Sequence, residues 1–290
     1  MTTDYSIVID SPSDFPRVLQ SKHEIFIVPS RVHIGDKTYK DRVGITRKTL
    51  FYELDRAKKD IWTTEAPVSD FIEAFDQAKE VSEHILYLGI SHKLSKSFQN
   101  AIIAARKYRG RITLIDTLSI SHGVTLMVQH ALLRREQGIE LVPLVHEINE
   151  MIRNTRLYVL VENLKYLYKG GRIGRAQQTI GTLLNINPLL HLVDGELDAL
   201  MSIRGTKASF EAITEKISEH AKEFRNFALA GSYGKESEVF EELSTSLKVK
   251  LNPLFYCYDE IGPAVLTNVG PIVEALFIAK IPDNAVEAYR

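Results

Sequence analysis

The first half of the chain alternates short apolar runs with amphipathic stretches, and this alternation constrains the fold more than any other feature. Strands are expected at residues 5–9, 25–29, 84–89 and 112–116, where apolar residues follow one another. Helices are expected at residues 15–20, 47–58, 68–82, 97–109, 123–137 and 143–154. A repeat of strand, helix and strand at this spacing predicts a parallel sheet with right-handed crossovers.

The pattern changes near residue 157, where hairpins mix with helices. Strands are expected at residues 157–161, 189–194, 196–203, 226–232, 254–259 and 273–279, and helices at 164–169, 176–184, 210–223 and 236–247. Asp194-Gly195 is a hairpin signal, as is Gly35-Asp36 in the first half. We therefore predict two domains: an α/β domain of residues 1–156 with a parallel sheet, and an α+β domain of residues 157–290 with a mainly antiparallel sheet.

Composition excludes several classes of protein. The formal net charge is −1, so the overall charge favours neither nucleic acid nor an anionic membrane as a partner. The single cysteine, Cys257, excludes an internal disulfide and a cysteine-rich metal site. No apolar run approaches the roughly 18 residues of a membrane-spanning helix, and the N-terminus lacks a signal region. We expect a soluble cytoplasmic protein without an integral membrane segment.

Polar clusters follow several of the expected strands, at residues 10–11, 91–97, 116–117 and 119–121. Ligands bind at this edge of a parallel sheet, so the clusters are expected to converge on one site. Helix capping is the alternative for each hydroxyl taken alone, above all for Thr64, Ser95 and Ser97.

Gly170-Gly171-Arg172 is the most specific short segment of the second half. Adjacent glycines allow a positive φ or a close approach of the backbone to another group. A helix expected after this segment would direct free backbone amides where the Arg172 guanidinium points, which suits an anion. A helix start beside a surface arginine is the alternative.

Motifs for catalysis and metal binding are absent from the sequence. No GxSxG, GxxxxGK[ST] or GxGxxG occurs. The nine histidines are scattered, without a second histidine four residues away or a cysteine at ligand spacing. Ser95 has no evident histidine or aspartate to activate it. We expect no catalytic residue, no metal and no cofactor.

Several longer segments carry a family resemblance: Ile9-Asp-Ser11, Thr63-Thr-Glu-Ala-Pro67, Ile90-Ser-His-Lys-Leu-Ser-Lys-Ser-Phe98, Ile115-Asp-Thr117 with Ser121-His-Gly123, the glycine–arginine segment, Arg204-Gly-Thr-Lys-Ala208 and Ile261-Gly-Pro263. With them the chain resembles the DegV family of two-domain bacterial proteins over nearly its whole length. The resemblance implies a long-chain fatty acid bound between the domains. Some members are the acyl-binding subunit of bacterial fatty acid kinase and present the carboxylate to a separate catalytic subunit.

The resemblance also implies a head-group site. The family's carboxylate-binding threonine and serine correspond to Thr63 and Ser95. A family histidine corresponds to Asn268, which can donate a hydrogen bond but cannot relay a proton. Lys96 replaces a family glycine, and it would either pair with the carboxylate or point to solvent.

Other residues of the matching segments are weaker candidates. Thr64, Ser91 and His92 are further candidates for contact with the head group. Arg204 matches an arginine that serves the phosphate or the kinase in relatives coupled to a kinase. With Gly170, Gly171 and Arg172 it forms the candidate site for an anion or a partner.

The leading hypothesis is a non-enzymatic protein that encloses one fatty acid in an apolar tunnel between its domains. Presentation of that acid to a fatty acid kinase subunit is a further step, which the replacement of the histidine by Asn268 leaves open. One alternative is a stand-alone small-molecule enzyme acting on a phosphate or carboxylate substrate, with Arg172 and Arg204 as anion clamps. Another is a regulatory protein whose partner docks on a basic strip of Lys165, Lys169, Arg172 and Arg175.

Overall fold

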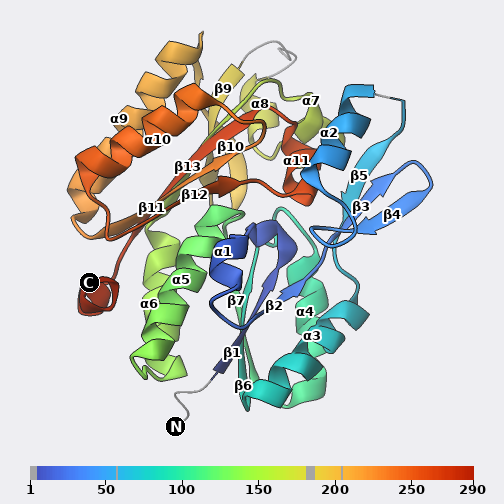
Figure 1. The fold of residues 1–290 in the computed structure, drawn as a ribbon, viewed down its shortest axis with the longest axis vertical. Helices are drawn as coiled ribbons and strands as arrows, with labels where there is room; N and C mark the ends of the chain where they lie inside the picture. The colour runs from blue at the N-terminus through green and yellow to red at the C-terminus, as the bar shows by residue number, and fades with distance from the viewer. Residues whose placement is uncertain (1–4, 57, 181–186, 204) are drawn as a thin grey trace.

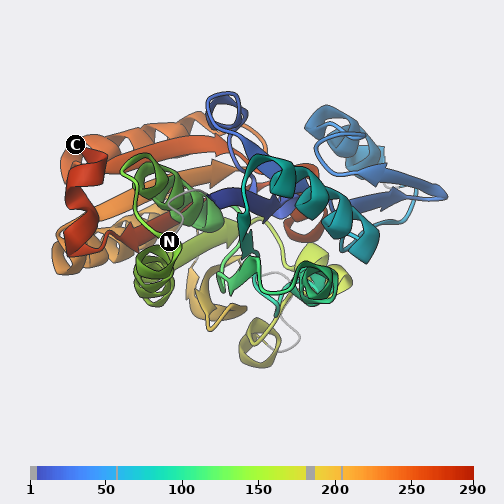
Figure 2. The same ribbon diagram turned by 90° about the horizontal axis from the view of Figure 1, so that it is seen from below.

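The computed structural model describes residues 5–56, 58–180, 187–203 and 205–290, which form two halves stacked on one another (Figure 1). The first half holds a parallel sheet of four strands, and the second holds a sheet of six strands. A third sheet of three short strands projects at the end away from the C-terminus (Figure 2). The predicted fold class, a parallel-sheet half followed by a mainly antiparallel half, is confirmed.

The four-stranded sheet has the order β2-β1-β6-β7, and all of its strands are parallel. The strands are β1 (Tyr5–Asp10), β2 (Ile25–Val28), β6 (His84–Gly89) and β7 (Ile112–Asp116). The helices around it are α3 (Val68–Val81), α4 (Ser97–Ala105), α5 (His122–Glu136) and α6 (Leu141–Arg153). Because side chains alternate along a strand, Val8 packs with α3 and α4 while Ile7 packs with α5 and α6.

The six-stranded sheet has the order β10-β9-β8-β13-β11-β12 and is antiparallel except between β11 and β12. The strands are β8 (Thr155–Val161), β9 (Asn187–Val193), β10 (Glu196–Ile203), β11 (Phe227–Tyr233), β12 (Phe255–Glu260) and β13 (Val273–Lys280). α9 (Thr206–Phe224) and α10 (Glu238–Leu251) cover one face. The other face meets α5, so the two halves share a core that includes Val124 and Phe277.

The three-stranded sheet, with the order β4-β3-β5, belongs to the first half of the chain. Its strands are β3 (Arg31–Ile34), β4 (Lys37–Lys40) and β5 (Ile61–Thr64), and α2 (Arg47–Arg56) lies beside them. β3 and β4 form the predicted hairpin, with Gly35 at a φ of 55° in its turn. β5 is not expected from the sequence, because this short run becomes a strand only through its pairing with β3.

Short helical segments complete the chain: α1 (Arg17–Gln20), α7 (Lys165–Gly170), α8 (Ala176–Ile180) and α11 (Pro263–Val269). α11 is not among the predicted helices, and the helix predicted at 176–184 falls within the described residues only as far as 180. None of the helices in the described ranges is long and apolar enough to cross a membrane.

The last residues return to the first half. A 3-10 segment, Asp283–Tyr289, packs against α5, where the Tyr289 hydroxyl lies 3.0 Å from His130 Nδ1. Asn284 of the same segment donates to Glu147 of α6 over 2.8 Å. The C-terminal segment therefore contacts helices of the first half. The division of the chain into domains at residue 156 stays a prediction.

Candidate functional site

A narrow cavity, here called the inner cavity, is lined from both halves. β8 and β13 supply Leu157, Val159 and Phe277, and the first half supplies Ile90 and Leu94. The space between the lining atoms is about 850 Å³ when the part open to solvent is counted.

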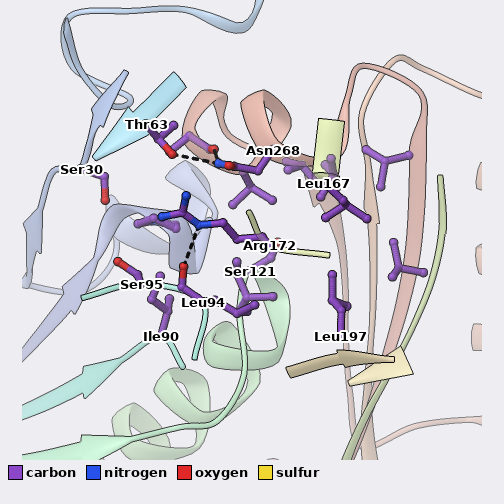
Figure 3. Close-up of a pocket in the computed structure, with 18 of the residues that line it drawn as sticks. Ser30, Thr63, Ile90, Leu94, Ser95, Ser121, Leu167, Arg172, Leu197 and Asn268 are labelled. Carbon is purple, nitrogen blue, oxygen red and sulfur yellow. Dashed lines mark hydrogen bonds between the residues drawn. The ribbon is translucent and has the colours of Figure 1, made fainter. Parts of the chain in front are cut away.

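Polar side chains gather at one side of the inner cavity, opposite Leu167 and Leu197 (Figure 3). Among them, Asn268 of α11 donates through Nδ2 to Thr63 Oγ1 of β5 over 3.0 Å and to the Ala264 carbonyl over 2.9 Å. The carbonyl can only accept, which fixes the orientation of the amide. Thr63 then accepts from Asn268 and keeps its own proton for another partner.

Thr63 and Thr64 face opposite sides of β5, because successive side chains alternate in a strand. Thr63 is half-buried, whereas Thr64 is exposed and its hydroxyl lies 2.9 Å from Nε2 of His33. Thr64 borders the inner cavity, but its hydroxyl contacts His33 on the opposite face of the sheet.

Ser95 lies at the polar side of the inner cavity, just before α4. Its Oγ accepts the Ser97 amide proton and donates to the Ser97 hydroxyl, both over 3.1 Å. Ser95 thus satisfies the first amide of α4, although Lys96 occupies the N-cap position. The Ser95 hydroxyl donates only to the uncharged Ser97 hydroxyl, and such a hydrogen bond is weaker than one to an anion. The Ser95 hydroxyl can therefore rotate to donate to an anionic ligand.

The other candidates of the same loop lie elsewhere. Ser91 is buried and donates to the Gly195 carbonyl over 2.7 Å, and His92 contacts the carboxylate of Asp116. Neither lines the inner cavity. Lys96 is exposed and also stays outside its wall.

The Gly170-Gly171-Arg172 turn ends a helix and does not begin one. Gly171 has a φ of 69°, its amide donates to the Tyr168 carbonyl over 3.1 Å, and the Arg172 amide donates to the Leu167 carbonyl over 2.9 Å. This is the Schellman pairing that closes α7. The expectation that free helix-start amides accompany Arg172 is therefore wrong, because both amides are used and α8 begins only at Ala176.

The side chain of Arg172 crosses to the first half. Its Nε donates to the Leu94 carbonyl over 3.1 Å, and its Nη1 donates to the Gly170 carbonyl. Figure 3 shows the guanidinium between Thr63 and Ser95. Arg172 thus brings a positive charge to the polar side of the inner cavity.

A wider outer cavity shares Thr63, Arg172 and Asn268 with the inner one. Its wall also carries four lysines and two acids: Lys58, Lys59, Lys165, Lys169, Glu53 and Asp60. Lys169 pairs with Asp60 over 2.9 Å and Lys59 with Glu53 over 3.4 Å, which leaves positive charge in excess.

Arg175 of the predicted basic strip is not in this wall and pairs with Glu196 over 3.3 Å. Arg204, the other predicted anion or partner residue, lies outside the described residues.

Ser121, from a polar cluster that the sequence places at this edge of the sheet, lines the inner cavity, whereas Ser30 and Glu65 escape sequence reasoning as site residues. Ser30 follows β2 and Ser121 follows β7, so the rule that ligands bind at the carboxyl ends of parallel strands indicates both. Glu65 has no signal of its own beyond its position after Thr63.

Buried carboxylates lie behind the polar side of the cavity. Burial raises the pKa of Asp10 and of Asp14 to about 7, and it also raises the pKa of Asp41. The buried His122 has its pKa lowered to about 3 for the same reason. Within the described ranges, no group of three or more His, Cys, Asp or Glu residues could hold a metal ion.

Comparisons with known proteins identify the family of this chain. A family model described as "uncharacterised protein, DegV family" matches residues 4–280. A DegV domain-containing protein of Caldanaerobacter subterraneus is 30% identical over 94% of this chain and 97% of its own length. A protein of Thermotoga maritima named as fatty acid-binding is 28% identical over 91% of this chain and 94% of its own.

The solved structure of a DegV family protein from Thermus thermophilus, described by its fatty acid binding, has a TM-score of 0.89 with 29% identity. The match covers 96% of this chain and 99% of that one. The match over both halves, in sequence and in fold, shows that this chain belongs to the DegV family.

Proposed function

We propose that this protein binds one long-chain fatty acid between its two halves, with the carboxylate at Thr63 and Ser95 and the chain in the inner cavity. The observation that carries the proposal is the gathering of hydroxyl, amide and guanidinium groups at one side of an otherwise mostly apolar cavity. The relatives from Thermotoga maritima and Thermus thermophilus, both described by fatty acid binding, support the same class of ligand.

The tail provides most of the affinity in this proposal. A sixteen-carbon chain buries about fourteen methylenes at roughly 0.8 kcal/mol each, on the order of 11 kcal/mol before the cost of ordering. The head group must still be paired, because a buried carboxylate without partners is very unfavourable. Thr63 and Ser95 offer two hydroxyl donors, and Arg172 offers a nearby positive charge.

Mass spectrometry of a solvent extract of the purified protein tests this proposal. The expected result is a long-chain fatty acid in about one-to-one ratio with the protein, and direct binding of palmitate by the stripped protein. A phosphorylated or small polar metabolite in its place would favour the stand-alone enzyme with arginine clamps. Failure of the stripped protein to bind any fatty acid would exclude the proposal.

We further propose that the protein presents the bound carboxylate to a fatty acid kinase catalytic subunit and does no chemistry alone. The cationic outer cavity supports this step, because it shares Thr63, Arg172 and Asn268 with the inner cavity and suits an approaching phosphate. Asn268 cannot relay a proton, so the kinase subunit would have to supply any acid or base.

Reconstitution with a fatty acid kinase subunit tests this second step. Arg204→Ala is expected to keep palmitate affinity within about tenfold, roughly 1.4 kcal/mol, and to abolish acyl phosphate formation. Normal phosphorylation of palmitate by the alanine variant would refute the role of Arg204. No phosphorylation with the wild-type protein, although palmitate is bound, would refute presentation to the kinase.

A further inference from the structure

α11 begins without a cap of its own, and the first half of the chain supplies one. Gly262 precedes the helix and has no side chain, and Pro263 has no amide proton. The Gly262 amide donates to Asp14 Oδ1 over 2.9 Å, and the Ala264 amide donates to Asp41 Oδ1 over 3.0 Å. Two aspartates distant in sequence thus satisfy the first amides of α11.

Both carboxylates are buried and are held by a second contact. Asp14 and Asp41 are each 1% exposed. Asp14 Oδ2 accepts the Ser121 hydroxyl proton over 2.7 Å, and Asp41 Oδ2 accepts that of Ser11 over 2.7 Å. Because both oxygens of each carboxylate are bonded, the acceptors have fixed positions, and they fix the start of α11.

α11 connects its capped first residues to Asn268 at the head-group site. Asn268 lies about one turn after Ala264 and donates to its carbonyl over 2.9 Å. Its second amide proton goes to Thr63 Oγ1 over 3.0 Å. Hydrogen bonds weaken steeply with distance and angle, so a small shift at the start of α11 would separate Asn268 from Thr63.

We propose that Asp14 and Asp41 are positioning residues for carboxylate recognition: by capping α11 they aim Asn268 at Thr63 and so direct the Thr63 proton to the head group. The inference rests on the proposed fatty acid binding, since it concerns the same site. Neither aspartate lines the inner cavity, so the effect of each passes through its hydrogen-bonding partners.

Paired binding measurements with palmitate and 1-hexadecanol test the proposal, because the two ligands share a tail and differ in the head group. Asp41→Ala is expected to weaken palmitate binding by about tenfold and hexadecanol binding by less than about twofold. Asp41→Asn keeps a neutral acceptor for the Ala264 amide, and a loss of about threefold for palmitate is expected. Equal losses for the two ligands, or no loss, would overturn the proposal.

A second substitution that restores the cap distinguishes the capping of α11 by Asp14 from the contact of Asp14 with Ser121. Asp14→Ala is expected to weaken palmitate selectively. It also removes the oxygen with which a β-carbon at Gly262 would collide. Adding Gly262→Ser then gives α11 a cap of its own and is expected to restore most of the palmitate affinity. A double variant as weak as Asp14→Ala would overturn the capping explanation.

Glu147→Gln is the matched control. Glu147 is also a buried acid, but it accepts from Arg134 and Asn284, not from α11, and it lines neither cavity. The ratio of palmitate to hexadecanol affinity should stay at the wild-type value, and a changed ratio would contradict the proposal. If the wild-type protein binds palmitate but the aspartate variants show no selective loss, this inference fails alone; if the wild type binds no palmitate, the proposed function fails as well.

Discussion

Gly170 lies directly against the side chain of Asn268, so closely that a β-carbon on the glycine would collide with Asn268 Oδ1. The end of α7 and the side of α11 can approach in this way only because residue 170 has no side chain. The first glycine of the turn therefore makes room for the head-group site. The second, Gly171, provides the positive φ of 69° that ends α7.

Gly170→Ala is expected to weaken palmitate binding by about tenfold, because the added methyl group pushes Asn268 away from Thr63. Gly171→Ala is the neighbouring control, since nothing lies within 4 Å of its would-be β-carbon. It should lower the free energy of unfolding by about 1 kcal/mol, through its positive φ, and leave palmitate affinity unchanged. Calorimetry and urea unfolding measure both effects. Wild-type affinity in Gly170→Ala would contradict the role given to Asn268.

Thr63→Ala and Thr64→Ala should differ sharply, although the two residues are adjacent. Thr63→Ala is expected to weaken palmitate binding by about 1–3 kcal/mol, the cost of removing one donor from a buried carboxylate. Thr64→Ala is expected to cost less than about 0.5 kcal/mol, because its hydroxyl contacts His33 on the other face of β5. Isothermal titration would show the contrast. Equal losses would mean that β5 presents both side chains to the ligand.

Glu65 places a carboxylate in the wall that is proposed to receive the carboxylate of the ligand. Glu65→Gln should therefore strengthen palmitate binding at neutral pH by about threefold, since it removes a like charge from a partly solvated site. Hexadecanol binding should not change. Weaker palmitate binding by the variant would show that Glu65 helps to hold the acid.

The stability of Asp14→Asn relative to the wild type should depend on pH. Burial raises the pKa of Asp14 from 3.8 to about 7, so the folded wild type takes up a proton between pH 7 and 4 that the unfolded chain does not. Acidification over that range therefore stabilises the wild type through this group, by up to about 1.4 kcal/mol per pH unit. The variant lacks this gain, so its relative stability is highest above pH 7 and falls toward pH 4.

Urea unfolding at several pH values measures this difference. Asp76→Asn is the control, because the Tyr108 hydroxyl bonded to Asp76 lowers the pKa of that carboxyl. The stability difference for Asp76→Asn should therefore stay level between pH 7 and 4.5. A level difference for Asp14→Asn would mean that its carboxyl titrates in the folded protein as it does in the unfolded chain.

The sequence predicts the two sheets well because their strands are apolar and regularly spaced, as in β1 and β6. It misses β5 and α11, the elements that hold Thr63 and Asn268. β5 has four residues and exists through pairing with β3. α11 has only local signals, of which Pro263 at its first position is the clearest.

The sequence identifies residues that share one cavity, but it does not indicate how they are arranged relative to one another. Thr63, Ser95, Asn268 and Arg172 do line one cavity. No local pattern indicates that Thr64 turns outward, since that follows from a strand formed by tertiary pairing. The bond between Asp14 and the Gly262 amide likewise joins loops far apart in sequence, and only the folded chain shows it.

A crystal structure of the protein with palmitate tests the central claim most directly. The account predicts the carboxylate within hydrogen-bond distance of Thr63 Oγ1 and Ser95 Oγ, about 2.5–3.0 Å, with the chain running past Leu167 toward Phe277 in the inner cavity. A palmitate bound outside the inner cavity, or one whose carboxylate lies at the apolar side, would contradict it.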